Sequence, residues 1–138
     1  MSGRNIACYV VAVVVLVSFQ GRGGSDPLQK AIVGAFSEGK ASYLTPYMAS
    51  EVRLKIGGGT PGQLLSNIQA ERILQEFFRT FPPQGFSLIH RGRAEGDQTY
   101  WMGTYRTENA RKFRVYIIAR VVRNSPQIVE IRISEAAR

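Results

Sequence analysis

The strongest hydrophobic pattern in the chain lies between Ser66 and Phe81, in the stretch SNIQAERILQEFFRTF. Its apolar residues recur at spacings of three and four, which places them on one face of an α-helix. Ser66 and Gln69 form a capping-box pattern at the start, and Pro82 ends the helix because proline has no N–H to donate. The predicted buried face is formed by Ala70, Ile73, Leu74, Phe77, Phe78 and Phe81.

A shorter amphipathic helix is predicted before this one. Asp26 can cap it, Pro27 suits its first position, and Gly39 can end it in the left-handed conformation. Its apolar residues again recur at helical spacing, through Leu28, Ile32, Val33 and Phe36. Three shorter elements follow, which are a short helix over Ala41–Met48 broken near Pro46, a strand over Glu51–Ile56 and a loop over Gly57–Gly62.

After Gly85 the hydrophobic period changes from helical to alternating, which is typical of strands. Turns of about three residues separate four such segments, and connections this short join antiparallel neighbours. Both faces of the third segment are partly apolar, so one face is expected to pack on helices and the other to be only partly wet. The predicted strands are Phe86–Arg93, Gln98–Arg106, Lys112–Arg123 and Gln127–Ser134.

Several segments resemble a known family. They are AIVGAFSEGKASYL, EVRLKI, AERILQEFFRTFPP, FRVYIIARVV and IVEIRI, and together they span about Asp26–Ile133. The chain is similar to a small exported bacterial family of unknown function in the nuclear-transport-factor-two-like (cystatin-like, cone-shaped) superfamily. The resemblance implies an α+β fold, in which N-terminal helices pack on a strongly curved antiparallel sheet around a pocket. It implies no activity, because none is established for the group.

Residues 1–24 have the features of a signal peptide. Met1–Asn5 carries Arg4, and Ile6–Phe19 is an apolar run of 14 residues, shorter than the roughly 20 that a membrane-spanning helix needs. The cleavage site is not defined by the sequence, and an uncleaved anchor is the alternative. We therefore expect an exported protein, periplasmic or secreted, with a single domain over residues 25–138.

Composition narrows the chemistry. The formal net charge of +8 favours anionic partners or surfaces without naming one. The only cysteine, Cys8, lies in the apolar leader, so no disulfide or cysteine metal site is expected in the mature region. The lone histidine makes no ligand set, so no metal and no cofactor are expected. The GGGTPG loop has Gln63 and Leu64 where a phosphate-binding loop needs Lys and Ser or Thr.

Basic residues concentrate on the predicted meander, with aromatic residues between them. This composition is typical of a nucleic-acid platform. However, the charges are expected on both strand faces, and export separates the chain from most nucleic acid. A solvated sheet rim is therefore favoured over nucleic-acid binding. The residues concerned are Arg91, Arg93, Arg106, Arg111, Lys112, Arg114, Arg120 and Arg123.

His90 is the one candidate catalytic base. The superfamily includes ketosteroid isomerase and scytalone-dehydratase-like enzymes, which implies an Asp or His base with a Tyr or Asp proton donor. Here Asp26 is assigned to a helix cap and Asp97 to a turn, so no such set is identified. The alternative for His90 is a half-buried strand histidine with a backbone partner. The candidate ligand-binding residues are Tyr43, Tyr47, His90, Trp101 and Tyr105, for which ordinary packing is the alternative.

The function expected from the sequence is non-enzymatic binding. The domain would bind a small apolar or amphipathic ligand, or a protein partner, through the cone pocket or the sheet. Two alternatives stay open, namely an isomerase- or dehydratase-type enzyme that uses His90 with a pocket tyrosine, and a structural module that forms a homodimer through its sheet. Membrane contact is expected only through the leader, if it is retained.

Overall fold

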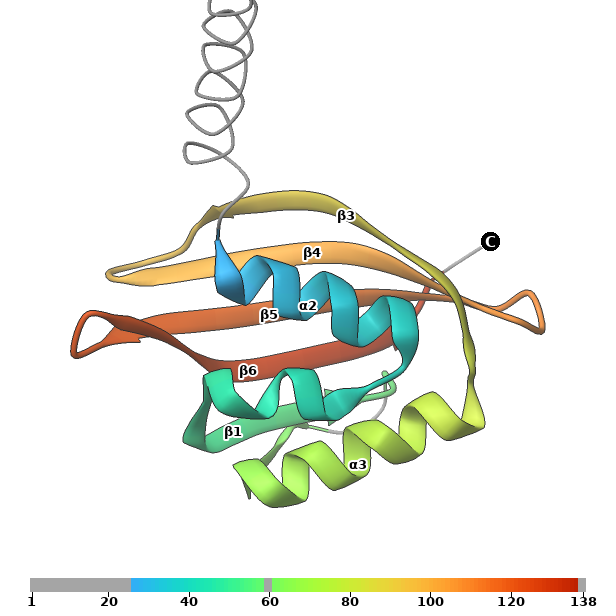
Figure 1. Ribbon diagram of the computed structural model, residues 1–138, viewed down its shortest axis with the longest axis horizontal. Helices are drawn as coiled ribbons and strands as arrows, with labels where there is room; N and C mark the ends of the chain where they lie inside the picture. Colours follow the sequence, from blue (N-terminus) through green and yellow to red (C-terminus); the bar gives the residue numbers. More distant parts are fainter. Residues whose placement is uncertain (1–25, 59–60, 137–138) are drawn as a thin grey trace, which may run out of the picture.

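The computed structural model describes residues 26–58 and 61–136, which form an α+β arrangement of helices and one sheet (Figure 1). The predicted signal peptide, and Gly59 and Thr60 of the predicted loop, lie outside the described residues. No described helix has the length and apolar character that crossing a membrane requires. The elements are α2 (Pro27–Glu38), the 3-10 helices Ala41–Tyr43 and Thr45–Tyr47, β1 (Met48–Ile56), β2 (Gln63–Ser66), α3 (Asn67–Thr80), β3 (Pro83–Arg93), β4 (Gln98–Thr107), β5 (Lys112–Val122) and β6 (Ser125–Glu135).

Helix α3 confirms the predicted helix and its capping box. The Ser66 hydroxyl accepts a hydrogen bond from the Gln69 N–H at 3.2 Å, and the Gln69 side chain accepts one from the Ser66 N–H at 3.1 Å. The prediction that Ile73 is buried is wrong, since 39% of this residue is exposed. Phe78 on one flank of the helix packs against Phe36 of α2, whereas Ile73 on another flank lines an open hollow with Leu54 of β1 and Gln63 of β2.

Helix α2 also follows the prediction. Asp26 caps it through a hydrogen bond from the Leu28 N–H at 3.0 Å, and Gly39 ends it with a φ of 73°. The predicted helix over Ala41–Met48 is instead two 3-10 turns, and β1 already begins at Met48. Gln75 of α3 ties these turns down, because its side chain accepts from the Ala41 N–H at 2.9 Å and donates to the Gly39 carbonyl at 3.0 Å.

The sheet has six strands in the order β2-β1-β6-β5-β4-β3. Strands β3 to β6 form the predicted antiparallel meander. The expectation of a wholly antiparallel sheet is wrong, because β1 pairs with β6 in parallel. The edge strand β2 was not predicted either, since four residues are too few to show an alternating pattern.

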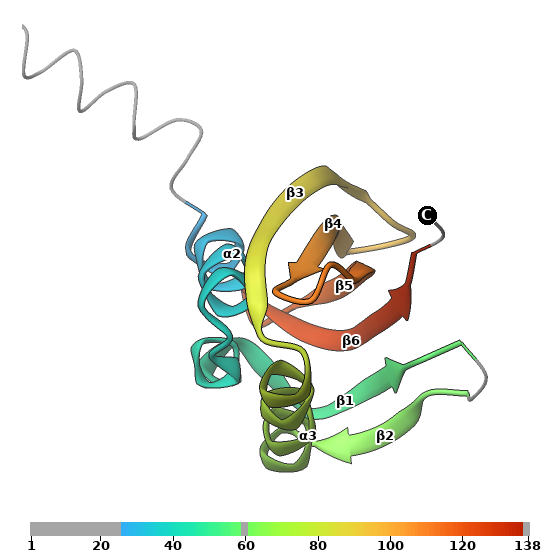
Figure 2. The same ribbon diagram turned by 90° about the vertical axis from the view of Figure 1, so that its right-hand side faces the viewer.

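All the described helices lie on one side of this twisted sheet, as Figure 2 shows. We call the other side the open face. Paired residues on neighbouring strands point to the same side, so the register assigns its members. They are His90 of β3, Tyr100, Met102, Thr104 and Arg106 of β4, Lys112, Arg114, Tyr116, Ile118 and Arg120 of β5, Glu130 and Arg132 of β6, and Glu51, Arg53 and Lys55 of β1.

Aromatic rings fill the space between the helices and the covered face. Ring centroids of neighbouring members lie 5.0 to 6.3 Å apart, within the range of favourable aromatic contacts. The rings come from both helices, from Phe81 directly after α3 and from three strands, so the cluster joins the helices to the sheet. Its members are Phe36, Phe77, Phe78, Phe81, Phe86, Tyr105 and Phe113.

Replacing Phe77 by alanine tests this cluster, because its ring contacts the rings of Phe78, Phe81, Tyr105 and Phe113. We expect Phe77→Ala to lower the free energy of unfolding by about 3–5 kcal/mol, the range for removing a buried aromatic side chain. The matched control is Ile73→Ala on the same helix, with an expected loss of about 1 kcal/mol or less. Urea unfolding measures both. A loss at Ile73 as large as that at Phe77 would contradict the observed orientation of α3.

Candidate functional site

Tyr105 and its surroundings fill the interior where the sequence predicts a pocket. The side chain is fully buried, and its hydroxyl donates to the Phe81 carbonyl at 2.6 Å. Burial, and to a smaller extent the charge of Glu108, raises the pKa of Tyr105 well above its ordinary value. The phenol is therefore held in its neutral form, and its hydroxyl proton points at the Phe81 carbonyl. This environment suits a structural hydrogen bond better than proton transfer to a ligand.

Trp101 is also buried, and it anchors the start of α2 to the sheet. Its indole N–H donates to the Gln29 side chain at 3.3 Å. The Arg91 guanidinium lies 5.7 Å from the centroid of the Trp101 ring and forms an ion pair with Asp26 at 3.1 Å. The polar end and one face of the indole are thus occupied by groups of the domain itself.

Tyr43 and Tyr47 come together at a different place, on the 3-10 turns beside α2. With Pro27, Lys30 and other residues they line an open hollow of about 550 Å³. The Tyr43 hydroxyl donates to Glu38 at 2.8 Å, and this hydrogen bond raises the pKa of Tyr43. The hollow is a shallow surface feature, separate from the interior that holds Tyr105.

His90 lies on the open face and is exposed. A register shift between Leu88 and His90 places it opposite Met102, whereas Arg91 lies opposite Trp101 on the covered side. The five candidate ligand-binding residues therefore fall in three places rather than one: Trp101 and Tyr105 on the covered side, Tyr43 and Tyr47 beside α2, and His90 on the open face.

A row of side chains in contact, with two stacked rings at its centre, crosses the open face from β3 to β6. The rings of Tyr100 and Tyr116 stack with centroids 5.3 Å apart and an interplanar angle of 12°. The His90 ring lies 5.4 Å from Tyr100 at one end, and the Arg132 guanidinium lies 5.7 Å from the Tyr116 centroid at the other. Gly92 makes room for this row, because a Cβ there would lie 2.7 Å from the Tyr100 ring.

Tyr116 was not among the candidates taken from the sequence. Its alternation with Arg114 and Ile118 places it on the partly wet side of β5 but does not reveal a partner. The stack depends on the pairing of Met102 with Tyr116, which brings Tyr100 and Tyr116 into diagonal contact. Only the cross-strand register could have identified this feature.

The strand register shows on which face of the sheet the basic residues of the meander lie. Arg106, Lys112, Arg114 and Arg120 share the open face. Arg91 and Arg93 lie by register on the covered side, so the charges fall on both faces, as expected. Arg111 lies in the turn before β5, where it pairs with Glu135 at 2.7 Å. That hydrogen-bonded pair raises the pKa of the Arg111 guanidinium.

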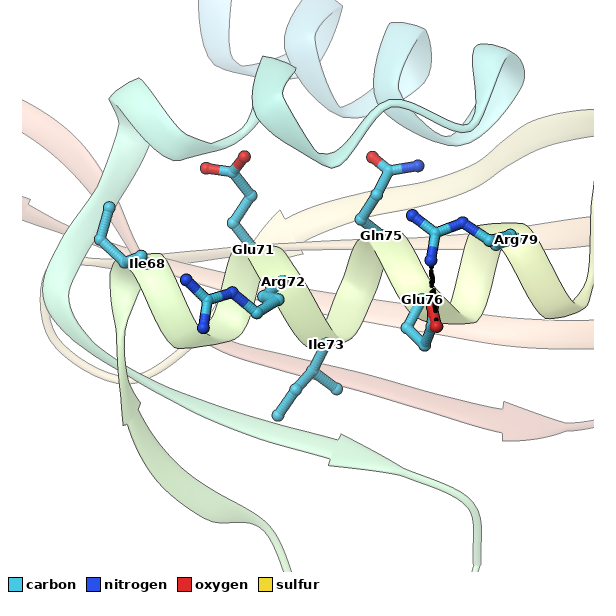
Figure 3. Close-up of a pocket in the computed structure, with 7 residues that line it drawn as sticks. All are labelled: Ile68, Glu71, Arg72, Ile73, Gln75, Glu76 and Arg79. Carbon is cyan, nitrogen blue, oxygen red and sulfur yellow. Dashed lines mark hydrogen bonds and ion pairs between the residues drawn. The ribbon is translucent and has the colours of Figure 1, made fainter.

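A second open hollow, of about 630 Å³, runs along the outer side of α3 (Figure 3). Two of its polar residues serve the fold, since Glu71 accepts from the Thr45 hydroxyl at 2.6 Å and Gln75 holds the 3-10 turns. Glu76 and Arg79 pair with each other. The figure shows Glu71 and Gln75 directed towards the 3-10 turns and Ile73 directed away from them, so these side chains do not converge on one point.

Comparison with solved structures defines the class of fold. An NTF2-like protein of unknown function from Shewanella baltica superposes with a TM-score of 0.61, over 80% of this chain and 90% of that one, at 7% sequence identity. An NTF2-like protein from Silicibacter pomeroyi superposes with a TM-score of 0.56, at 11% identity, over 95% of this chain and 98% of that one. The chain thus has the nuclear-transport-factor-two-like α+β fold.

The family is narrower than the fold. The model of the domain of unknown function DUF4783 matches residues 29–134, and the chain belongs to this family. A family member from Bacteroides ovatus is 29% identical, with a TM-score of 0.71 over 78% of this chain and 94% of its own. A member from Bacteroides fragilis is also 29% identical, with a TM-score of 0.69 over 77% and 96%. No curated protein matches the chain. The resemblance drawn from the sequence is therefore confirmed.

Removing the hydroxyl of Tyr105 tests its role. We expect Tyr105→Phe to lower the free energy of unfolding by about 1–3 kcal/mol at neutral pH, because the Phe81 carbonyl loses its hydrogen-bond donor. A folded-state pKa raised above 10.0 means that folding favours the neutral phenol. This stability is complete below pH 10 and is lost as the pH rises through the folded-state pKa.

The difference in the free energy of unfolding between wild type and Tyr105→Phe, here called the stability gap, should therefore shrink above pH 10. Urea unfolding at a series of pH values measures the gap. The control is Tyr47→Phe, whose expected change is within about 0.5 kcal/mol. A gap that stays constant up to strongly alkaline pH would show that burial of Tyr105 does not govern its ionisation.

Proposed function

We propose that this domain is a non-enzymatic binding module that engages a macromolecular partner through the open face of its sheet. The observation that carries the proposal is the apolar centre of that face, formed by Tyr100, Met102, Tyr116 and Ile118. These side chains are half-buried in the isolated chain, and no described element covers them. A contiguous apolar patch that faces solvent is typical of an interaction site.

The interior supports the same choice. Seven rings pack between the helices and the covered face of the sheet, and the polar groups of Tyr105 and Trp101 already have partners within the domain. A ligand of appreciable size would have to displace these contacts. Binding at the surface leaves them intact, which favours the sheet over the cone pocket as the binding element.

Acid–base chemistry has no comparable support in the geometry. In the described part of the chain, the groups with clearly shifted pKa values are Tyr43, Tyr105 and Arg111, and each is engaged in a separate local contact. Within residues 26–58 and 61–136, no three His, Cys, Asp or Glu side chains gather as a metal site would require. His90 is exposed, and the aromatic ring nearest to it, Tyr100, is one of the two stacked rings. A binding role accounts for these positions more simply.

Site-specific photo-crosslinking tests the proposal. A benzoylphenylalanine replacing Tyr116 in the full chain, expressed in the organism that carries it, should form a covalent adduct with a second macromolecule on irradiation. The matched control places the same group at Tyr43, an exposed tyrosine beside α2. Gel analysis and mass spectrometry read the result. No adduct at position 116, or equal adducts at both positions, would refute binding through the open face.

A further inference from the structure

The open face has a distinct layout of charge around its apolar centre. Its basic side chains occupy both ends of β5 and the adjoining strands, so they surround Tyr116 and Ile118 rather than mixing with them. We call them the basic rim: Arg53, Lys55, Arg106, Lys112, Arg114, Arg120 and Arg132. The acidic residues assigned to this face are Glu51 and Glu130.

Most of the basic rim has no internal counter-charge. Arg132 is hydrogen-bonded to Glu130. Among the described residues, none of the other six rim residues forms an ion pair with a carboxylate. By contrast, Arg79, Arg91 and Arg111, away from this face, each have an acidic partner. Other described cations without a carboxylate partner, such as Lys30, Arg72 and Arg123, lie scattered elsewhere, whereas the six rim residues share one face with the apolar centre.

This charge layout disfavours a second copy of the chain as the occupant. A two-fold contact between identical open faces would place one basic rim against the other. Like charges brought together in an interface cost several kcal/mol and act against that pairing. A different molecule that carries negative charge fits the same face without this penalty.

The apolar centre further restricts the occupant. Nucleic acids and sugars are typically bound by stacking on an exposed ring face. Here Tyr100 and Tyr116 stack on each other, and their outer sides meet His90 and Arg132. The remaining ring edges, with Met102 and Ile118, suit an apolar counter-surface. An apolar core inside a charged rim, rich in Tyr, Met and Arg, is typical of protein–protein interfaces.

We propose that the open face binds a different protein, whose docking surface has an apolar centre bordered by carboxylates. This partner chemistry depends on the proposed function, since it names what the open face engages. The tyrosines and the two apolar residues supply the contact area. The basic rim provides orientation and speeds association at low salt.

Two synthetic peptides of equal length and charge isolate these contributions, one of Glu-Glu-Phe repeats and one of Glu-Glu-Ser repeats. Titration into the 15N-labelled chain, followed by NMR, should show the Glu-Glu-Phe peptide shifting the amide signals of Tyr100, Met102, Tyr116 and Ile118. We expect it to bind about tenfold more tightly than the Glu-Glu-Ser peptide, because only it fills the apolar centre. Tyr116→Ser should remove most of this difference.

The charge requirement is tested with Arg106→Gln/Arg114→Gln, which should weaken binding of the Glu-Glu-Phe peptide about tenfold at low salt. The matched control, Arg72→Gln/Arg79→Gln on α3, removes the same charge from another surface and should leave the affinity unchanged. Arg120 is left out because Glu95 and Asp97 lie in the turn next to its end of β5.

Three results would overturn the inference. Equal affinity for the two peptides, or tighter binding of a heparin fragment or of anionic vesicles, would indicate a simple polyanion or lipid surface. Sedimentation showing a wild-type dimer that Tyr116→Ser abolishes would indicate a second copy. An affinity for the Glu-Glu-Phe peptide that is the same in Arg106→Gln/Arg114→Gln as in wild type would show that the basic rim is not needed for binding. If crosslinking at position 116 still captures a partner, the proposed function survives such a result; if it captures none, both fall.

Discussion

Packing of aromatic rings around Tyr105 holds this domain together. Tyr105 of β4 contacts Phe36 of α2, Phe77 and Phe78 of α3, and Phe113 of β5. No helix or strand in this set could bury its apolar face alone, so each depends on the others through the cluster. The only polar side-chain atom of the cluster, the Tyr105 hydroxyl, donates a hydrogen bond to the Phe81 carbonyl, so this buried polar group is not left unsatisfied.

Aromatic rings fill the interior of the domain, so the side chains that remain accessible to a partner lie on its surface. Two glycines illustrate how the sheet accommodates rings on both sides, since Phe86 lies over Gly103 on the covered side and Tyr100 lies over Gly92 on the open face. Absence of a Cβ lets each ring approach the neighbouring strand closely. The covered side uses this contact for stability, whereas the open face keeps its stacked rings beside solvent and unpaired cations.

Local signals in the sequence predicted most of the helices and strands. The capping box at Ser66 and Gln69, the Asp26 cap and the left-handed Gly39 each depend on neighbouring residues, so they could be read directly. Ile73 could not be placed in this way, because its exposure depends on which flank of α3 meets α2. The candidate site was harder still, because the stack of Tyr100 on Tyr116 and the side on which His90 lies depend on strand register and on a bulge. Neither is encoded in the periodicity of one strand.

The position of β6 in the sheet has a consequence for biosynthesis. This strand, at residues 125–135, lies between β1 and β5, and among the described strands it alone joins the β1–β2 pair to β3, β4 and β5 within the sheet. Synthesis on the ribosome therefore completes β6 after the other five strands. Because β1 and β6 are far apart in the sequence, β1 can pair with its parallel neighbour only at the end of synthesis. Until then the nascent chain keeps apolar strand surfaces unpaired. That delay lengthens the interval in which a chaperone can hold the chain before the sheet closes.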